Sequence, residues 1–186
     1  MPDMSWLPAG WRHPRHHQLS TGHHLRPIRE SDIDVDYPAV MGSRERLWGL
    51  FGQVWGWPPA TMTREQDRDD LARHEREIEA HESFNYALFV DGSESALLGC
   101  VYVDPPEKVG ADADVCWWVV DDLVGSPVET ALEEEVPAWL AARWPFATVR
   151  YPGRELSWQE WEALPDHPEH GPRPPGEIGV EGGGRR

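Results

Sequence analysis

The chain has 186 residues, 39% of them hydrophobic, which suffices for one domain of ordinary size around a single core. Its 33 acidic residues against 17 basic ones give a formal net charge of −16, which disfavours nucleic acid or an anionic membrane surface as partner. Two cysteines, no apolar run long enough to span a membrane and no signal-like start lead us to expect a cytoplasmic protein.

The two ends of the chain differ in composition from its middle. Residues 1–21 carry Trp, Pro and His without a hydrophobic period, and residues 165–186 contain five Pro and six Gly. Such segments bury too little apolar area to offset the entropy that is lost when they become ordered. We therefore predict an N-terminal arm over residues 1–21, a folded domain over 22–164 and a disordered tail over 165–186.

The domain opens with a short strand over residues 25–29 and then changes to helical spacing. Ser31 and Asp34 resemble a capping box at the start of the first helix, whose apolar spacing breaks at Gly42. After a link rich in Trp and Pro, a second capping box begins a strongly charged helix over residues 64–82. That second box consists of Thr63 and Gln66.

The middle of the domain favours strands. Residues 84–90 and 96–104 flank the turn DGSES and predict a hairpin, and residues 113–120 predict a third strand. The elements expected after it are a helix over 126–143, a strand over 146–151 and a short helix capped by Ser157 and Glu160. The order β-α-α-β-β-β-α-β-α predicts an α+β fold, with helices on both faces of a mixed, mostly antiparallel sheet.

Three segments together resemble the GNAT superfamily of N-acetyltransferases, over about residues 25–151. The family's first strand and helix are similar to HLRPIRESDIDVDYPAVM, and its second and third strands to YALFVDGSESALLGCVYVDP. Its fourth strand and the following helix are similar to DVCWWVVDDLVGSPVETALEEEVPAWL. The resemblance implies a GNAT-like twisted sheet whose C-terminal hairpin is missing here, because the chain runs into Pro and Gly.

The resemblance also implies acetyl-CoA as cosubstrate. In the family, backbone groups of the fourth strand pair with the pantetheine arm, and the matching positions here are Trp118, Val119 and Val120. The turn that follows the strand holds the pyrophosphate at a helix N-terminus, and it matches Gly125 and Ser126 here.

Three residues depart from the family's pattern in that turn. Val124 stands where the family has Gln or Arg, Pro127 where it has Gly, and Glu129 where it has Gly or Ala. Without the family, the same residues read as a well-formed helix start with Ser126 as N-cap, so the protein's own side chains would satisfy the free N–H groups. Whether CoA binds through this turn therefore stays open.

Catalytic residues are implied at the two ends of the site. Asp112 and Asp114 open the fourth family strand and could act as the base that deprotonates an amine, or be solvated carboxylates at a strand end. Tyr151 could act as acid to the leaving thiolate, or be buried for structural reasons. Transfer would be direct, because neither Cys100 nor Cys116 is placed as an acyl carrier and both are expected in the core.

Two further compositional features bear on function. Five of the nine histidines lie near the N-terminus without a metal-ligand spacing, which predicts a mobile polar arm and no metal site. They are His13, His16, His17, His23 and His24. Adjacent Trp117 and Trp118 must point to opposite faces of their strand, and an aromatic wall beside an acidic surface could hold a cationic amine.

Two functions remain open on these observations. The first is an acyl-CoA-dependent N-acetyltransferase that acts on a small-molecule or protein amine. The second is a non-catalytic GNAT-like module that binds a ligand or partner and has lost the pyrophosphate turn. The sequence names neither the acceptor nor the oligomeric state.

Overall fold

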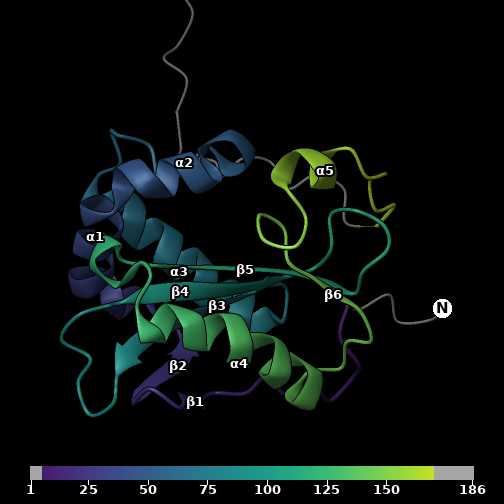
Figure 1. Ribbon diagram of the computed structural model, residues 1–186, viewed down its shortest axis with the longest axis horizontal. Coiled ribbons are helices and arrows are strands. Elements are labelled where there is room, and N and C mark those ends of the chain that lie inside the picture. The colour runs from purple at the N-terminus through teal and green to yellow at the C-terminus, as the bar shows by residue number, and fades with distance from the viewer. Residues whose placement is uncertain (1–5, 170–186) are drawn as a thin grey trace, which may run out of the picture.

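The computed structural model describes residues 6–169, and a single six-stranded sheet organises them (Figure 1). The strands lie in chain order, and every neighbouring pair is antiparallel except the last, which is parallel. They are β1 (His17–Leu19), β2 (His23–Pro27), β3 (Phe84–Val90), β4 (Gly99–Asp104), β5 (Ala113–Val119) and β6 (Val149–Arg150). The predicted mixed, mostly antiparallel sheet is confirmed.

Helices cover both faces of the sheet. On one face lie α1 (Ile33–Gly42), α2 (Arg44–Trp55) and α3 (Arg64–Ala80), and on the other lies α4 (Pro127–Arg143) (Figure 1). Short helices complete the chain: η1 (Glu30–Asp32), η2 (Asp121–Leu123) and α5 (Trp158–Glu162). Because both faces are covered, β5 is buried at every position and β3 at all but its last, and neither shows the alternation of a half-exposed strand.

The predicted helix starts are confirmed where the two capping residues, three positions apart in the sequence, bond to each other. The boxes of Thr63 with Gln66 and of Ser157 with Glu160 are present, and α1 ends at Gly42 as expected. The cap at Ser31 is wrong. The chain turns helical two residues earlier, with Arg29 as the N-cap of η1, and Asp32 accepts from the Arg29 N–H at 2.8 Å.

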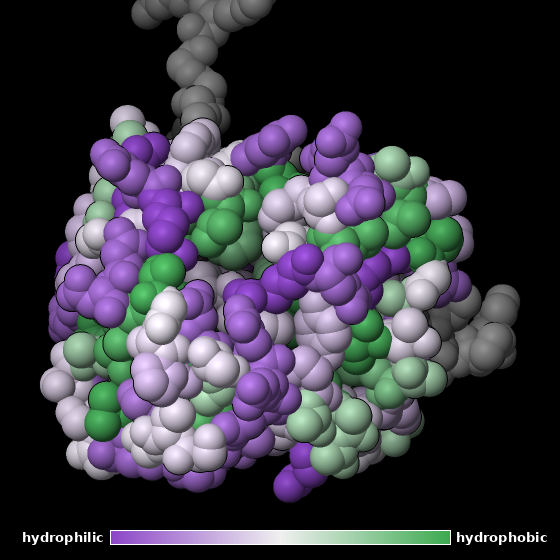
Figure 2. Space-filling model, viewed as in Figure 1, coloured by the Kyte–Doolittle hydropathy of each residue, from purple (hydrophilic) through white to green (hydrophobic). Residues whose placement is uncertain are grey.

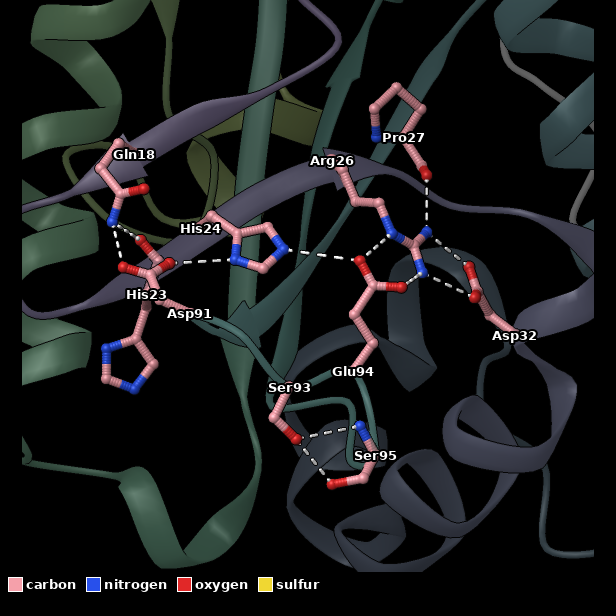
Figure 3. Close-up of polar contacts among 10 residues, drawn as sticks. All are labelled: Gln18, His23, His24, Arg26, Pro27, Asp32, Asp91, Ser93, Glu94 and Ser95. Carbon is pink, nitrogen blue, oxygen red and sulfur yellow. Dashed lines mark hydrogen bonds and ion pairs between the residues drawn. The ribbon is translucent and has the colours of Figure 1, made fainter.

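A polar network explains that difference, because Asp32 is also held by a residue from the sheet (Figure 3). The Arg26 guanidinium lies between Asp32 and Glu94, at 2.8 Å from each carboxylate, and its hydrogen bond lowers the pKa of Glu94 to about 2. The His24 Nδ1 lies 3.0 Å from Asp91, which belongs to the same β3–β4 turn as Glu94. The network ties the β3–β4 turn and η1 to β2.

The N-terminal segment is part of the fold, so the prediction of a mobile polar arm is wrong for its described residues. Leu7 and Leu19 are buried in the core, and β1 pairs with β2. The ring of Trp11 lies 4.8 Å from that of Trp144, and Trp6 stacks on Phe146 at 5.4 Å. These indole rings bury apolar area that the sequence period did not reveal.

The other end of the described chain also touches the body. Lys108 pairs with Asp166 at 2.6 Å, and the His167 N–H donates to the Glu107 carbonyl at 2.8 Å. After β6 the described residues form α5 and isolated bridges without a further strand. The predicted tail beyond residue 169 lies outside the described residues.

On the side shown in Figure 2, hydrophilic residues are interspersed with smaller hydrophobic patches. Between residues 6 and 169 no helix is long and apolar enough to cross a membrane.

Candidate active site

A cleft opens where β5 and β6 part. The two strands pair at Ala113 with Val149 and at Asp114 with Arg150, after which β5 continues to Val119 without β6 beside it. The cleft beyond this pair has a volume of about 190 Å³. It is lined by Arg46, Leu50, Phe51, Cys116, Trp117, Trp118, Glu129, Pro152, Gly153, Arg154 and Trp158.

Two arginines cap the open edge of β5. The Arg154 Nη2 donates to the Trp117 carbonyl at 3.1 Å, and the Arg46 Nη2 donates to the Val119 carbonyl. Carbonyls on an open strand edge need a donor. Here they receive it from side chains that are about a quarter exposed, not from a neighbouring strand.

Each of these arginines is held by a second contact. Arg154 lies over the Trp117 ring, with its guanidinium carbon 3.9 Å from the ring centre, and it pairs with Glu133 at 3.0 Å. Arg46, in the first turn of α2, pairs with Asp121 at 2.6 Å. Sequence analysis missed both arginines, because their partners lie on other elements and no local pattern marks them.

The turn before α4 forms as a self-capped helix start. Ser126 is the N-cap and Pro127 the first helical residue, as predicted. The Glu129 carboxylate accepts from the Gly125 N–H at 2.6 Å, one residue before the N-cap position that a capping box would use. Gly125 has a φ of 73°, which favours glycine. The N–H groups of Gly125 and Ser126 are therefore already bonded, and Pro127 has none.

Of the other predicted cofactor-binding residues, Trp118 and Val119 face the cleft, whereas the backbone of Val120 is bonded within the sheet. Trp118 lines the cleft, and the Val119 carbonyl faces Arg46. The Val120 N–H instead donates to the Leu98 carbonyl at 2.9 Å, on the opposite side of the chain from β6.

The two predicted base residues are bound into the sheet junction. Asp112 accepts from the N–H groups of Ala147 and Thr148, each at 2.8 Å. Asp114 is 9% exposed, and it accepts from Arg150 Nε at 2.7 Å and from Trp161 Nε1 at 3.1 Å. Neither side chain lines the cleft. The structure brings them together with β6, and their role as base stays a prediction.

Tyr151 follows β6 directly and lies beside the cleft. Its ring packs edge-on against Trp117, with 5.8 Å between the ring centres. Burial, with the Glu155 carboxylate nearby, raises the pKa of Tyr151 to about 12. The hydroxyl therefore stays protonated at neutral pH, which an acid requires. That role also stays a prediction.

The two cysteines are buried free thiols on neighbouring strands, as expected. Cys116 lines the cleft and Cys100 does not. Burial raises the pKa of both thiols well above the usual range, so neither is a thiolate at neutral pH. Within residues 6–169 no three His, Cys, Asp or Glu side chains are grouped to hold a metal ion.

Comparison with known proteins identifies the fold. No protein-family model matches the sequence, and no curated protein does. Among solved structures, RimL, a ribosomal L7/L12 alpha-N-protein acetyltransferase in complex with coenzyme A, is 17% identical with a TM-score of 0.56, over 69% of each chain.

Two further solved structures give the same result. An acetyltransferase from Salmonella typhimurium that modifies the N-terminal serine of L7/L12 is 16% identical, with a TM-score of 0.53 over 68% of each chain. The microcin C7 self-immunity acetyltransferase MccE, in complex with acetyl-CoA and AMP, is 10% identical, with a TM-score of 0.53 over 70% of this chain and 69% of its own. The chain has the fold of the GNAT acetyltransferases.

Proposed function

We propose that this protein is an acyl-CoA-dependent N-acetyltransferase that uses acetyl-CoA as cosubstrate and an amine of a small molecule or protein as acceptor. The observation that carries the proposal is the open edge of β5, whose Trp117 and Val119 carbonyls face a cleft of about 190 Å³. A strand edge of this kind pairs with an extended amide-bearing chain, as added strands do. The pantetheine arm of CoA is such a chain.

The residues of the cleft fit the two parts of that cosubstrate differently. The edge carbonyls suit the pantetheine amides, provided that the Arg46 and Arg154 guanidiniums move off them. The turn at Gly125 is a poor phosphate site, because Glu129 already occupies its N–H and adds a negative charge. The cleft's own positive charge lies on Arg46 and Arg154, and we assign to them the phosphates that the turn would otherwise hold.

The chemistry asked of the protein is then modest. The bound cosubstrate supplies an acyl group on a thioester, and the acceptor must reach it as a neutral amine. Tyr151, protonated at neutral pH, is the acid we propose for the leaving thiolate, and Asp112 or Asp114 the base for the amine. Cys116 is a protonated thiol in the cleft wall, which supports direct transfer without an acyl-cysteine.

Release of the CoA thiol in the presence of amines tests the proposal. The panel contains polyamines, aminoglycosides, amino-acid amides and peptides with a free N-terminus, because the neighbours RimL and the Salmonella enzyme act on protein N-termini. We expect release with one class, at a rate that rises with pH and is retained in Cys116→Ala. Release that Cys116→Ala abolishes in the folded protein would contradict direct transfer.

A second function is favoured by the same turn. Because Glu129 caps Gly125 and Pro127 offers no N–H, a module that kept the fold and lost catalysis is the alternative. Saturable CoA binding with no release across the whole panel would support a ligand-binding module. For either function, the cytoplasmic location of the protein stays a prediction from composition.

A further inference from the structure

A second, smaller cavity lies on the opposite side of an aromatic wall from the cleft. Its volume is about 30 Å³, which is room for one small polar group such as a water molecule. It lies between α1, α3 and the strands β3 and β4. Trp118 of the cleft forms the wall, because its ring is 6.2 Å from Trp57 and its Nε1 donates to the Tyr102 hydroxyl at 2.9 Å. Trp57 and Tyr102 both line the small cavity.

The inner wall of this cavity includes hydrogen-bond acceptors that lack donors, beside the His74 Nδ1, which is also unbonded and lies 3.5 Å from the Glu77 Oε2. Asp67 Oδ2 and Asn85 Oδ1 are buried without a hydrogen-bond partner, and the two residues are only 2% and 3% exposed. Buried acceptors are almost always bonded, and leaving one unbonded is costly. Two such atoms from different elements, α3 and β3, face one small cavity, so the geometry calls for a donor between them.

The same wall carries an excess of carboxyl groups. Asp36 of α1 is 4% exposed and shares a hydrogen bond with Asp67. Burial raises the pKa of Asp36, and it raises the pKa of Asp67 to about 6, so the pair holds a proton that exposed carboxyls would release.

Three further titratable groups lie near the cavity. Asp70 and His74 of α3 line it, and Asp32 of η1 adds to the negative field at Asp36. Arg73 does not neutralise the pair, because it bonds to Asp70 at 3.0 Å and to Glu77 at 3.1 Å.

We propose that this cavity binds a primary ammonium group. An ammonium group brings N–H donors for Asp67 Oδ2 and Asn85 Oδ1 together with the positive charge that the two carboxyls lack. The rings of Trp57 and Tyr102 favour a cation that is weakly hydrated. The volume admits one such head group and excludes a quaternary one. The inference stands on this cavity alone and does not require acyl transfer in the cleft.

Thermal unfolding with small cations tests the site on the full chain. Methylammonium chloride should raise the Tm in a saturable way, whereas equal ionic strengths of sodium chloride or tetramethylammonium chloride should not. Asp67→Asn should abolish the effect, and Asp69→Asn, an exposed neighbour on α3, should keep it. Equal shifts with all three salts, or none with methylammonium, would overturn the proposal.

A second measurement does not depend on a variant that folds. In solutions of ¹⁵N-ammonium, a bound ion in a buried site should give a separate, slowly exchanging proton signal that methylammonium displaces. Binding at pH 6 should also release protons, seen as a calorimetric heat that depends on the buffer, because the cation favours the ionised carboxyls. Absence of a bound signal at saturating ammonium would mean that water alone occupies the cavity.

Discussion

At the scale of single residues, Arg46 and Arg154 set the character of the cleft. They place two guanidiniums on the edge carbonyls of β5 in a chain whose formal net charge is −16. Arginine is suited to both states, since its planar donors can bind a carbonyl in the free protein and a phosphate in the complex. The same two side chains therefore occupy the strand edge and supply the cleft's positive charge.

Arg46→Ala separates those two contributions. We expect acetyl-CoA to bind about tenfold more weakly, which corresponds to about 1.4 kcal/mol and is the scale of a hydrogen bond to a charged group. Acetyl-pantetheine, which lacks the nucleotide phosphates, should lose no affinity. Calorimetry with both ligands provides the comparison, and Arg68→Ala on the exposed side of α3 is the control. Equal losses for the two ligands would exclude a phosphate role for Arg46.

A second single residue, the buried His13, makes the stability of the fold depend on pH. Burial lowers its pKa to about 4, and its Nδ1 lies 3.1 Å from the His81 Nε2. The unfolded chain binds a proton near pH 6.5 and the folded one only near pH 4. The folded state is therefore penalised progressively as the pH falls through that window.

His13→Phe should remove this pH dependence and keep the ring beside Phe84. Between pH 7.5 and pH 5 the original chain should lose about 2 kcal/mol more unfolding free energy than the variant does. Chemical denaturation at the two pH values measures the difference. Identical losses in both proteins would show that His13 is protonated in the fold.

At the scale of elements, the junction of β5 and β6 decides where the cleft begins. Asp114 and Arg150 face each other across the parallel pair, and Trp161 of α5 bonds to the same carboxylate. This buried group ties a two-residue strand and a five-residue helix to the sheet. Beyond it the chain after β6 reaches β5 through side chains such as Arg154, which donates to the Trp117 carbonyl, and the strands part.

Asp114→Asn tests whether that carboxylate is structural or catalytic. Leaving Arg150 buried without its partner should cost about 3 kcal/mol of unfolding free energy. A structural role predicts a lower Tm with acyl transfer per folded molecule retained, whereas Asp122→Asn, at an exposed position, should change neither. A stable variant that has lost turnover, or whose residual turnover no longer depends on pH, would establish Asp114 as the base.

The start of α4 sets how well the cleft takes an anion. Glu129→Gln removes the negative charge beside Gly125 and weakens its cap. We expect acetyl-CoA to bind a few-fold more tightly while the unfolding free energy falls by about 1 kcal/mol. Glu134→Gln on the exposed face of the same helix is the matched control. Unchanged affinity would show that the Glu129 carboxylate does not act on the bound phosphates.

At the scale of the whole molecule, the sequence predicts those features of the fold that residues close together in the sequence determine. The order of the main elements from β2 onward, the parallel crossover before β6, and the caps at Thr63, Ser126 and Ser157 follow from local patterns, whereas β1 is not predicted by them. The start of η1, where Asp32 accepts from the Arg29 N–H, could not be predicted, because Arg26 of β2 holds that carboxylate in place.

Long-range packing also determines the features that the sequence missed. Leu7 and Leu19 belong to no periodic apolar pattern, and their burial depends on core residues far along the chain. The partners of Arg154 and Arg46 lie 37 and 73 residues away. The candidate site is thus the least predictable part of the molecule, because it is formed by such pairs.

One titration tests the central claim that the open edge of β5 is a CoA site. The full chain is titrated with acetyl-CoA and with desulfo-CoA, and the Tm and the Trp fluorescence are recorded. Trp117 and Trp118 line the cleft, so a saturable change in emission is expected. At a concentration 100 times the Kd, either ligand should raise the unfolding free energy by about 2.7 kcal/mol. No change in Tm or emission at millimolar ligand would contradict the claim.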